Sequence, residues 1–394
     1  MLSMLSDIKI LDLSTLLPGP YASMMLADLG AEVLRVESST RTDLLREMMP
    51  KVGESSAAHQ YLNRSKKSIA LDLKKPEAIE IIKALVKKYD VVLEQFRPGV
   101  MNRLGIGYEK IKAINPSIIY CAITGYGQTG PYKNRAGHDL NYLSISGISS
   151  YSKRKKQAPV PQGIQIADVA GGSLHSVIGI LAALHHRQKT GQGQFIDISM
   201  TDCAFALNAM GMPETLASNN ATNAESHLLN GGSFYDYYPT SDGRYISIGS
   251  IEPKFFNGLC KLLNLESLIP LANKASAQKQ IKDSFTQTFK QKSFTQWQSI
   301  FADLDLCVEP VLDLKEASNH PQLIARNMII DVPQKQNGLQ KQLSNPIKFS
   351  NYQVKYQQTG GEVGADSNEI LSQLGFNATS IAMLKKNGVV NNTN

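Results

Sequence analysis

The sequence predicts an α/β protein whose large domain is built on a mostly parallel, doubly wound sheet. Short apolar runs of strand length alternate with longer amphipathic stretches of helix length between residues 8 and 199. Turns that contain Pro and Gly separate them, as in LLPGP after the first run. Strands that alternate with helices pair in parallel, because each helix carries the chain back across the sheet.

The chain opens with a βαβ unit. It comprises a strand over 8–13, a helix over 21–29 that Gly30 closes, and a strand over 31–37. Further strands of the same sheet are expected over 67–73, 90–95, 117–123 and 194–199. Helices are expected over 75–89, 98–104, 108–115, 167–190 and 200–217. Each strand is a short apolar run bounded by turn residues, whereas the helices repeat apolar positions at helical spacing.

A smaller α+β domain is predicted over 230–315. The polar segment 218–229 is expected to be a linker between this domain and the large domain, whose N-terminal part would span 1–217. A hairpin that turns at Asp242-Gly243 opens the small domain, and helical patterns follow it. The return segment 316–394 contains strand-like and helical stretches that would complete the large domain.

Composition predicts an ordinary soluble globular protein. The chain has 394 residues, of which 42% are hydrophobic and 19% charged. Apolar stretches of membrane-spanning length are interrupted by charges or helix breakers, so no transmembrane helix is expected. The first residues, MLSMLSDIKI, have no basic segment before a long apolar run, so no secretory signal is expected. A cytoplasmic location is the resulting expectation.

The charge and the cysteine content limit the classes of ligand that the protein is expected to bind. The four cysteines are scattered without a CxxC pair, so neither a disulfide framework nor a metal site is expected. The net charge is +7, with small basic groups such as Arg64-Lys66-Lys67 and Lys153–Lys156. No nucleic-acid-binding module accompanies them, so no nucleic-acid partner is expected. A polyphosphate ligand and a solvated surface both explain such groups.

Three segments place a histidine and two carboxylates among small residues. They are AGHDLNY with His138, IADVAGGS with Asp168 and GSIEPKFF with Glu252. Imidazole acts as a base or an acid near neutral pH, and burial raises the pKa of a carboxyl group toward the same range. If the fold brings them to one carbon, His138 and Asp168 would remove a proton and return it. Glu252 would then orient the imidazole.

Each base also has a purely structural interpretation. His138 would then be a hydrogen-bonded loop residue, and Asp168 would be the N-cap of the helix that follows it. In the catalytic interpretation, the backbone N–H groups of Ala170–Ser173 stay open at the positive end of that helix and stabilise an oxyanion.

Two further segments are candidates for a phosphate site. LSTLLPGP follows the first strand, but it has no GxGxxG or GxxxxGK pattern and is equally explained as a turn. Arg97 follows the strand 90–95 at the same predicted edge of the sheet. Arg97 and part of the lysine cluster of NRSKKSIALDLKKPEA, which lies on both sides of a predicted strand, would converge there on phosphates, or Arg97 would be a structural ion-pair partner.

Together these segments resemble the family III coenzyme A transferases, and specifically their α-methylacyl-CoA racemase branch. The matching segments are STLLPGPYASMMLADLGAEVLRVE, SKKSIALDLKKP, EQFRPGVMNRLG, TGYGQTGPY, AGHDLNYLSISG, IADVAGGS, TGQGQFIDISM, LLNGGSFYDYY, GSIEPKFF and DLCVEPVL. They occur in order along nearly the whole chain. The resemblance implies a Rossmann-like large domain built from both termini, a small domain, and a homodimer of interlocked subunits.

The resemblance also implies residue roles. His138 and Asp168 correspond to the two bases of the racemases, and Glu252 to a glutamate that supports the histidine. The residues that correspond to contacts with coenzyme A and the acyl thioester are Arg97, Leu71, Asp72, Leu73, Lys74, Gly137, Asp139, Leu140, Asn141 and Tyr142.

The expected reaction is racemisation at the α-carbon of 2-methyl-branched acyl-CoA thioesters through an enolate. It would need no cofactor, because coenzyme A is part of the substrate, and no membrane partner is expected. One alternative is a CoA transferase that uses Asp168 as nucleophile; such members generally lack the histidine of GHDxNY. A second alternative is a non-catalytic acyl-CoA-binding protein.

Two positions depart from the racemase pattern. Ile164 stands where an Asn often precedes the aspartate by four residues, which concerns the acyl pocket. Ser38 stands where an Arg often follows VRVD or VRVE, which concerns a phosphate contact. Arg35 and Arg41 are the expected replacements for that contact.

Overall fold

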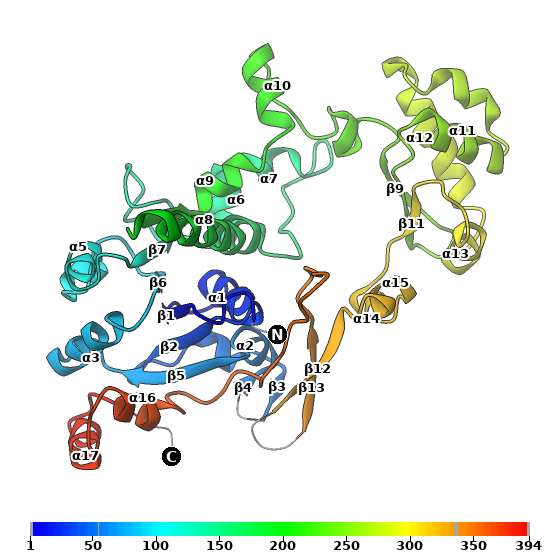
Figure 1. Ribbon diagram of the computed structural model, residues 1–394. Helices are drawn as coiled ribbons and strands as arrows, with labels where there is room; N and C mark the ends of the chain where they lie inside the picture. The colour runs from blue at the N-terminus through cyan, green and yellow to red at the C-terminus, as the bar shows by residue number, and fades with distance from the viewer. Residues whose placement is uncertain (1–2, 54, 335–337, 392–394) are drawn as a thin grey trace. The chain divides into compact units, whose positions relative to one another are not determined.

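The computed structural model describes residues 3–53, 55–334 and 338–391 (Figure 1). The chain divides into two compact units. The first comprises Met1–Ser146, Gln162–Leu207 and Ile324–Asn394, and the second comprises Gly147–Pro161 and Asn208–Leu323. Each unit is therefore built from segments that are not contiguous in the sequence.

The first unit contains a six-stranded parallel sheet. Its strands are β1 (Lys9–Leu13), β2 (Glu32–Ser38), β5 (Lys66–Leu71), β6 (Val91–Glu94), β7 (Ile119–Thr124) and β8 (Phe195–Ser199). They lie in the order β5-β2-β1-β6-β7-β8, and each neighbouring pair is parallel. The prediction of a large parallel sheet is confirmed. Strand order reverses between β1 and β6, which opens a crevice at their carboxyl ends.

Helices cover both faces of this sheet (Figure 1). On one face, α1 (Pro18–Asp28) packs against β1, β2 and β6, and α8 (His175–Thr190) packs against β7 and β8. The other face carries α3 (Pro76–Val86), α5 (Tyr108–Ile114), α16 (Ser367–Gln373) and α17 (Ala378–Lys386). These helices enclose an apolar core with the strand side chains Leu11, Leu34, Ile69 and Val92, all fully buried.

One described segment, Ala167–Thr190, is long and apolar enough to cross a membrane by length and composition alone. It consists of η2 (Ala167–Leu174), a π-helix, followed directly by α8. About half of its apolar stretch is buried. It packs against α1, α9 (Met200–Ala206), β7 and β8, as the core helix of a folded domain does.

Shorter elements complete the first unit. They are η1 (Leu44–Glu47), β3 (Lys51–Val52), β4 (Ser55–Ser56), α2 (Ala57–Leu62), α4 (Val100–Arg103), α6 (Asp139–Ile145), and the antiparallel pair β12 (Ile329–Pro333) and β13 (Leu339–Leu343). A final helix, α15 (Pro321–Ala325), spans the boundary between the units.

The second unit has a three-stranded antiparallel sheet, in which β10 (Tyr245–Ile248) pairs with β9 (Asp236–Pro239) and β11 (Val308–Pro310). The hairpin turns at Asp242-Gly243, as predicted, with Gly243 at a φ of 76°. The helices are α7 (Ile148–Tyr151), α10 (Gly211–Ser218), η3 (Leu228–Gly232), α11 (Pro253–Leu262), η4 (Glu266–Leu271), η5 (Ala275–Ala277), α12 (Gln278–Phe289), α13 (Phe294–Phe301) and α14 (Leu314–Ser318).

The unit boundaries differ from the predicted domain boundaries of 217 and 230. Residues 147–161 and 208–217 belong to the second unit, and the helix expected over 200–217 is split into α9 and α10. Side-chain contacts explain this. Arg154 forms ion pairs with Asp236 at 2.6 Å and Glu225 at 3.0 Å, and the Tyr151 hydroxyl donates to Asn208 Oδ1 at 2.6 Å. Sequence patterns do not reveal such long-range pairs.

Part of the basic group near residue 65 is buried rather than solvated. Arg64 is fully buried and donates to both carboxylate oxygens of Asp28, at 2.6 and 2.9 Å, and to the Leu343 carbonyl. Lys66 is also buried, and its Nζ donates to the Pro20 carbonyl at 2.9 Å. Only Lys67 of the three is solvent-accessible, so Arg64 and Lys66 are structural and are not the part of the lysine cluster that is open to a phosphate.

We predict that Arg64→Ala lowers the free energy of unfolding by about 3–5 kcal/mol, because the Asp28 carboxylate would stay buried without its partner. Lys67→Ala is the matched control. Its ion pair with Glu369 leaves the two side chains 39% and 50% exposed, so the loss should be below about 1 kcal/mol. Denaturant titration measures both variants. Equal losses would contradict this account of the buried pair.

Candidate active site

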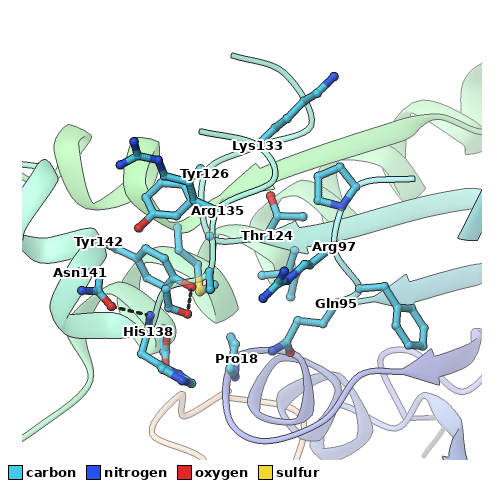
Figure 2. Close-up of a pocket in the computed structure, with 18 of the residues that line it drawn as sticks. Pro18, Gln95, Arg97, Thr124, Tyr126, Lys133, Arg135, His138, Asn141 and Tyr142 are labelled. Carbon is cyan, nitrogen blue, oxygen red and sulfur yellow. Dashed lines mark hydrogen bonds between the residues drawn. The ribbon is translucent and has the colours of Figure 1, made fainter. Parts of the chain in front are cut away.

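A cavity of about 400 Å³ lies at the carboxyl ends of β1, β6 and β7, where the strand order reverses (Figure 2). All of its walls belong to the first unit. The lining residues come from the loop after β1 and the start of α1, the loop after β6, the end of β7 and the glycine-rich segment after it, α6, η2 and α9. They are Leu16, Pro18, Gln95, Phe96, Arg97, Pro98, Ile123, Thr124, Gly125, Tyr126, Lys133, Arg135, Ala136, Gly137, His138, Asn141, Tyr142, Asp168 and Met200.

The loop after β1 is held against the cavity by side chains from other loops. Asp43 accepts the Leu16 N–H at 3.3 Å, and Gln95 Oε1 accepts the Gly19 N–H at 3.1 Å. Leu16 has a φ of 60°, a conformation that non-glycine residues rarely adopt. LSTLLPGP is therefore a specifically held turn whose Leu16 and Pro18 form part of the cavity wall.

Close packing around Tyr142 places the segment that carries His138. Tyr142 is buried, donates to the Gly137 carbonyl and stacks edge-on against Tyr126, with ring centroids 5.2 Å apart. A Cβ atom on Gly137 would lie 2.7 Å from the Tyr126 hydroxyl, and one on Gly125 would lie 2.6 Å from the Tyr142 ring. Both positions therefore require glycine for close approach.

His138 is the N-cap of α6, with an extended backbone. Its N–H donates to Asn141 Oδ1 at 3.0 Å, which fixes the first turn of the helix (Figure 2). The histidine is solvent-exposed on the cavity wall rather than buried in the core. This placement favours a chemical role for the ring over a packing role.

Asp168 lies in the same cavity wall, at the second residue of η2. The N-cap is Ile166, so the interpretation of Asp168 as an N-cap is wrong. Asp139 supplies the capping carboxylate instead: its Oδ1 accepts the N–H groups of Ala167 at 2.6 Å and Asp168 at 3.1 Å. Burial raises the pKa of the Asp168 carboxyl to about 7, and the negative charge of Asp139 acts in the same direction.

The backbone N–H groups expected to bind an oxyanion are not open. The N–H groups of Ala167 and Asp168 donate to Asp139, and that of Val169 donates to the Gln165 carbonyl at 2.9 Å. Ala170–Ser173 lie inside the π-helix, and Gly172 is buried against Pro18 and Met200. This part of the sequence-based prediction is therefore wrong, because the helix begins before Asp168 rather than after it.

Three cationic side chains line the cavity: Arg97, Lys133 and Arg135. Figure 2 shows Arg97 directed into the cavity from the loop after β6, whereas Lys133 extends away from it. No ion pair joins Arg97 to another of the described residues, which argues against a structural ion-pair role. The Arg135 guanidinium lies over the Tyr132 ring, 3.7 Å from its centroid.

Other cavity residues were not recognised in the sequence. Lys133 and Arg135 had one signal, the KNR run between two glycines of the loop after β7. Gln95, Thr124 and Tyr126 had none beyond their positions at or just after the ends of predicted strands. Within the described residues, no group of three or more His, Cys, Asp or Glu side chains is arranged to hold a metal ion.

Only some of the residues predicted to contact coenzyme A line the cavity. Gly137, Asn141 and Tyr142 line the cavity with Arg97, whereas Leu140 is exposed and Asp139 caps η2. Residues 71–74 do not line it, because β2 and β1 separate β5 from the crevice. They lie at the same carboxyl edge of the sheet. There Leu71 is fully buried, Leu73 packs on the core, and Asp72 Oδ1 accepts the Lys74 N–H at 3.1 Å.

Glu252 lies in the second unit, as the N-cap of α11, and is solvent-exposed. Its contact with His138 stays a prediction.

The structure also shows the surroundings of the two positions that depart from the racemase pattern, Ile164 and Ser38. Ile164 is 68% exposed and does not line the cavity. Arg35 is buried and paired with Asp43 and Glu37, so it cannot replace a phosphate contact at Ser38. Arg41 is exposed, and its N–H donates to Ser38 Oγ at 3.1 Å, which leaves its guanidinium as the candidate.

Comparisons with known proteins agree with this arrangement. The family model described as CoA-transferase family III matches residues 5–367. Alpha-methylacyl-CoA racemase of Homo sapiens is 34% identical over 390 residues, which cover 98% of this chain and 97% of that protein. Succinyl-CoA:glutarate CoA-transferase of Homo sapiens is 32% identical over 398 residues, which cover 98% of this chain and 90% of that protein.

Solved structures match as well. The crystal structure of a CAIB/BAIF family protein from Brucella suis is 31% identical, with a TM-score of 0.80 over 93% of this chain and 98% of that one. The family model spans nearly the whole sequence, and both the racemase and the transferase align over almost its full length. The chain therefore belongs to CoA-transferase family III.

Proposed function

We propose that this protein racemises the α-carbon of 2-methyl-branched acyl-CoA thioesters. The observation that carries the proposal is that His138 and Asp168, from segments 30 residues apart, line one cavity. A two-base 1,1-proton transfer uses two acid/base groups on opposite sides of one carbon, and the presence of both side chains in this cavity supports that mechanism.

In the proposed mechanism, one base removes the α-proton from one face of the α-carbon and the other base returns a proton to the opposite face. Asp168 removes the α-proton of one enantiomer, the electron pair passes into the thioester as an enolate, and His138 returns a proton from the other side. The opposite enantiomer reacts with the roles exchanged. A carboxyl pKa of about 7 suits Asp168 to both roles, because each protonation state is populated near neutral pH.

The cationic side chains of the cavity support the same assignment. Arg97, which is directed into the cavity, and Arg135 give it positive charge, which suits the phosphates of coenzyme A. In this proposal Arg97 contacts a phosphate, and Glu252 supports the imidazolium form of His138. Residues Leu71 to Lys74 extend the coenzyme A site along the carboxyl edge of the sheet.

CoA transfer is the second candidate function. It is favoured by relatives such as succinyl-CoA:glutarate CoA-transferase, whose identity to this chain is close to that of the racemase. In that reaction the ionised Asp168 would attack the thioester carbonyl and expel the thiolate of coenzyme A, forming an acyl anhydride on the enzyme. His138 would have no required role. This difference separates the two candidates.

We further propose a cytoplasmic homodimer that requires no cofactor beyond the coenzyme A of its substrate. Exposed apolar side chains of the first unit support an association between subunits, since Ile145 is 51%, Ile178 63% and Phe205 47% exposed.

We predict exchange of the α-proton of a chiral 2-methylacyl-CoA in deuterated water without any acceptor acid. Loss of optical purity should accompany the exchange, because the enolate is reprotonated on either face. Mass spectrometry and chiral chromatography measure the two events. Transfer of coenzyme A between two carboxylic acids with no deuterium incorporation would replace this proposal with the transferase.

We predict that His138→Ala and Asp168→Ala each slow racemisation by at least about 10²-fold in both directions, because both bases act in every turnover. His185→Ala and Asp303→Ala are matched controls, since both side chains are exposed outside the cavity. Rates are measured from each pure enantiomer. A silent His138→Ala beside an inactive Asp168→Ala would favour nucleophilic catalysis by Asp168.

We predict that Arg97→Ala raises KM for the acyl-CoA more than it lowers kcat. The phosphates lie far from the α-carbon, so the contact contributes to substrate and transition state alike. Lys110→Ala removes an exposed cation on α5 outside the cavity and is the charge-matched control. Steady-state kinetics at fixed ionic strength measure both, and an unchanged KM in Arg97→Ala would remove Arg97 from the site.

A further inference from the structure

We propose that Asp139 is a positioning residue that fixes the two bases of the cavity, His138 and Asp168, relative to each other, rather than a contact for the substrate. The inference deepens the proposed function and rests on it for the catalytic readout. It is carried by the placement of the Asp139 carboxylate between the helix that begins after His138 and the helix that contains Asp168.

The backbone of Asp139 is part of one helix, α6, whereas its side chain caps the start of another, η2. The residue is the first of α6, directly after the N-cap His138. Its side chain reaches η2, where one oxygen, Oδ1, accepts the N–H groups of Ala167 and Asp168 at 2.6 and 3.1 Å. The position of His138 is thereby tied, through its neighbour, to the backbone of Asp168.

Helix electrostatics stabilise this arrangement. The N–H groups of a first helical turn have no partners within the helix, and their dipoles favour a negative charge beside them. The Asp139 carboxylate lies at the start of the continuous helical segment Ala167–Thr190 and satisfies two of those donors. It is about half buried, and burial raises its own pKa although the two hydrogen bonds act to lower it.

The same carboxylate acts on the chemistry of its neighbour. Burial is the main cause of the raised Asp168 pKa, and the Asp139 charge adds to it because two nearby carboxylates resist simultaneous ionisation. A neutral residue at this position would fix the geometry of Asp168 without placing a negative charge beside its carboxyl group. Asp139 is placed to do both.

Other groups around η2 do not supply that charge. Burial raises the pKa of Tyr142 on α6 and of Cys203 on α9, so both are neutral at pH 7. Asp202 on α9 is exposed, and His138 and Arg97 line the same cavity as Asp168. Of these groups, Asp139 is the one whose charge acts on the Asp168 carboxyl.

The test uses two substitutions that separate charge from hydrogen bonding. Asp139→Asn keeps an Oδ1 acceptor for both N–H groups and removes the charge, whereas Asp139→Ala removes both. The first readout is independent of activity. It is the titration of the ¹³C-labelled Asp168 carboxyl by NMR, assigned through Asp168→Asn, in the full-length protein without substrate.

We predict that Asp139→Asn lowers the Asp168 pKa by roughly 0.5–1 unit while kcat at its new pH optimum stays within about threefold of wild type. In the direction in which Asp168 is the base, the acid limb of the rate profile should move to lower pH by the same amount. Asp139→Ala should lower kcat by at least a further tenfold or so, with KM changed much less, because the backbone N–H groups lose their acceptor.

The outcomes separate this inference from the proposed function. An unchanged Asp168 titration in Asp139→Asn, together with a folded Asp139→Ala that keeps the wild-type kcat, overturns it. A lowered Asp168 pKa in a protein that exchanges no α-deuterium keeps the positioning role and rejects racemisation. A large rise in KM in both variants, with kcat and the titration unchanged, would make Asp139 a substrate contact and also overturn it.

Discussion

A buried network of charges at the carboxyl ends of β1 and β2 is the constraint on which the rest of the molecule depends. Arg35, on β2, pairs with Asp43 and lies 3.4 Å from Glu37, all three almost inaccessible to water. Burial acts to raise the pKa of Glu37, but the cations Arg35 and Arg46 hold it below its usual range. Through Asp43 the network also holds the Leu16 N–H, and with it one wall of the cavity. Replacing one member would leave a neighbouring charge buried without a partner, which is far more costly than losing an exposed pair.

The sheet and the place of its crevice could be predicted from the sequence, because both follow from local patterns. The strand β7 is buried along its whole length, because helices cover both faces of the parallel sheet. Such a strand must be apolar at nearly every position, which makes it recognisable in the sequence. Once the alternation of strands and helices is recognised, loops that follow strands must gather at one edge. This is why Arg97 and the loop that carries His138 were expected at one edge, whereas Asp168 was found through its motif; all three line one cavity. Their motifs also carried the resemblance to a family that the comparisons then established.

What could not be predicted depends on pairs of residues far apart in the chain. Nothing in NRSKKS distinguishes Arg64, which is fully buried, from Lys67, which is solvent-accessible; the distinction comes from Asp28 and the Leu343 carbonyl. The helix boundary near Asp168 was misplaced for a similar reason. An aspartate before a glycine-rich helical run is typical of an N-cap, so the sequence predicts that role for Asp168. The capping carboxylate is instead that of Asp139, 29 residues earlier in the chain.

The discontinuous first unit has a consequence for how the protein is made. All six strands of the parallel sheet are translated before the residues that complete their surroundings, since the carbonyl partner of Arg64 comes 279 residues after it. A nascent chain on the ribosome can pair its strands while the second unit is still unmade. The Arg64–Asp28 pair then remains reachable by water, and one side of the sheet lacks α16 and α17, until the last part of the chain emerges. Premature termination between β8 and α16 would therefore leave a sheet with exposed apolar surface, which is the kind of species that chaperones retain and proteases remove.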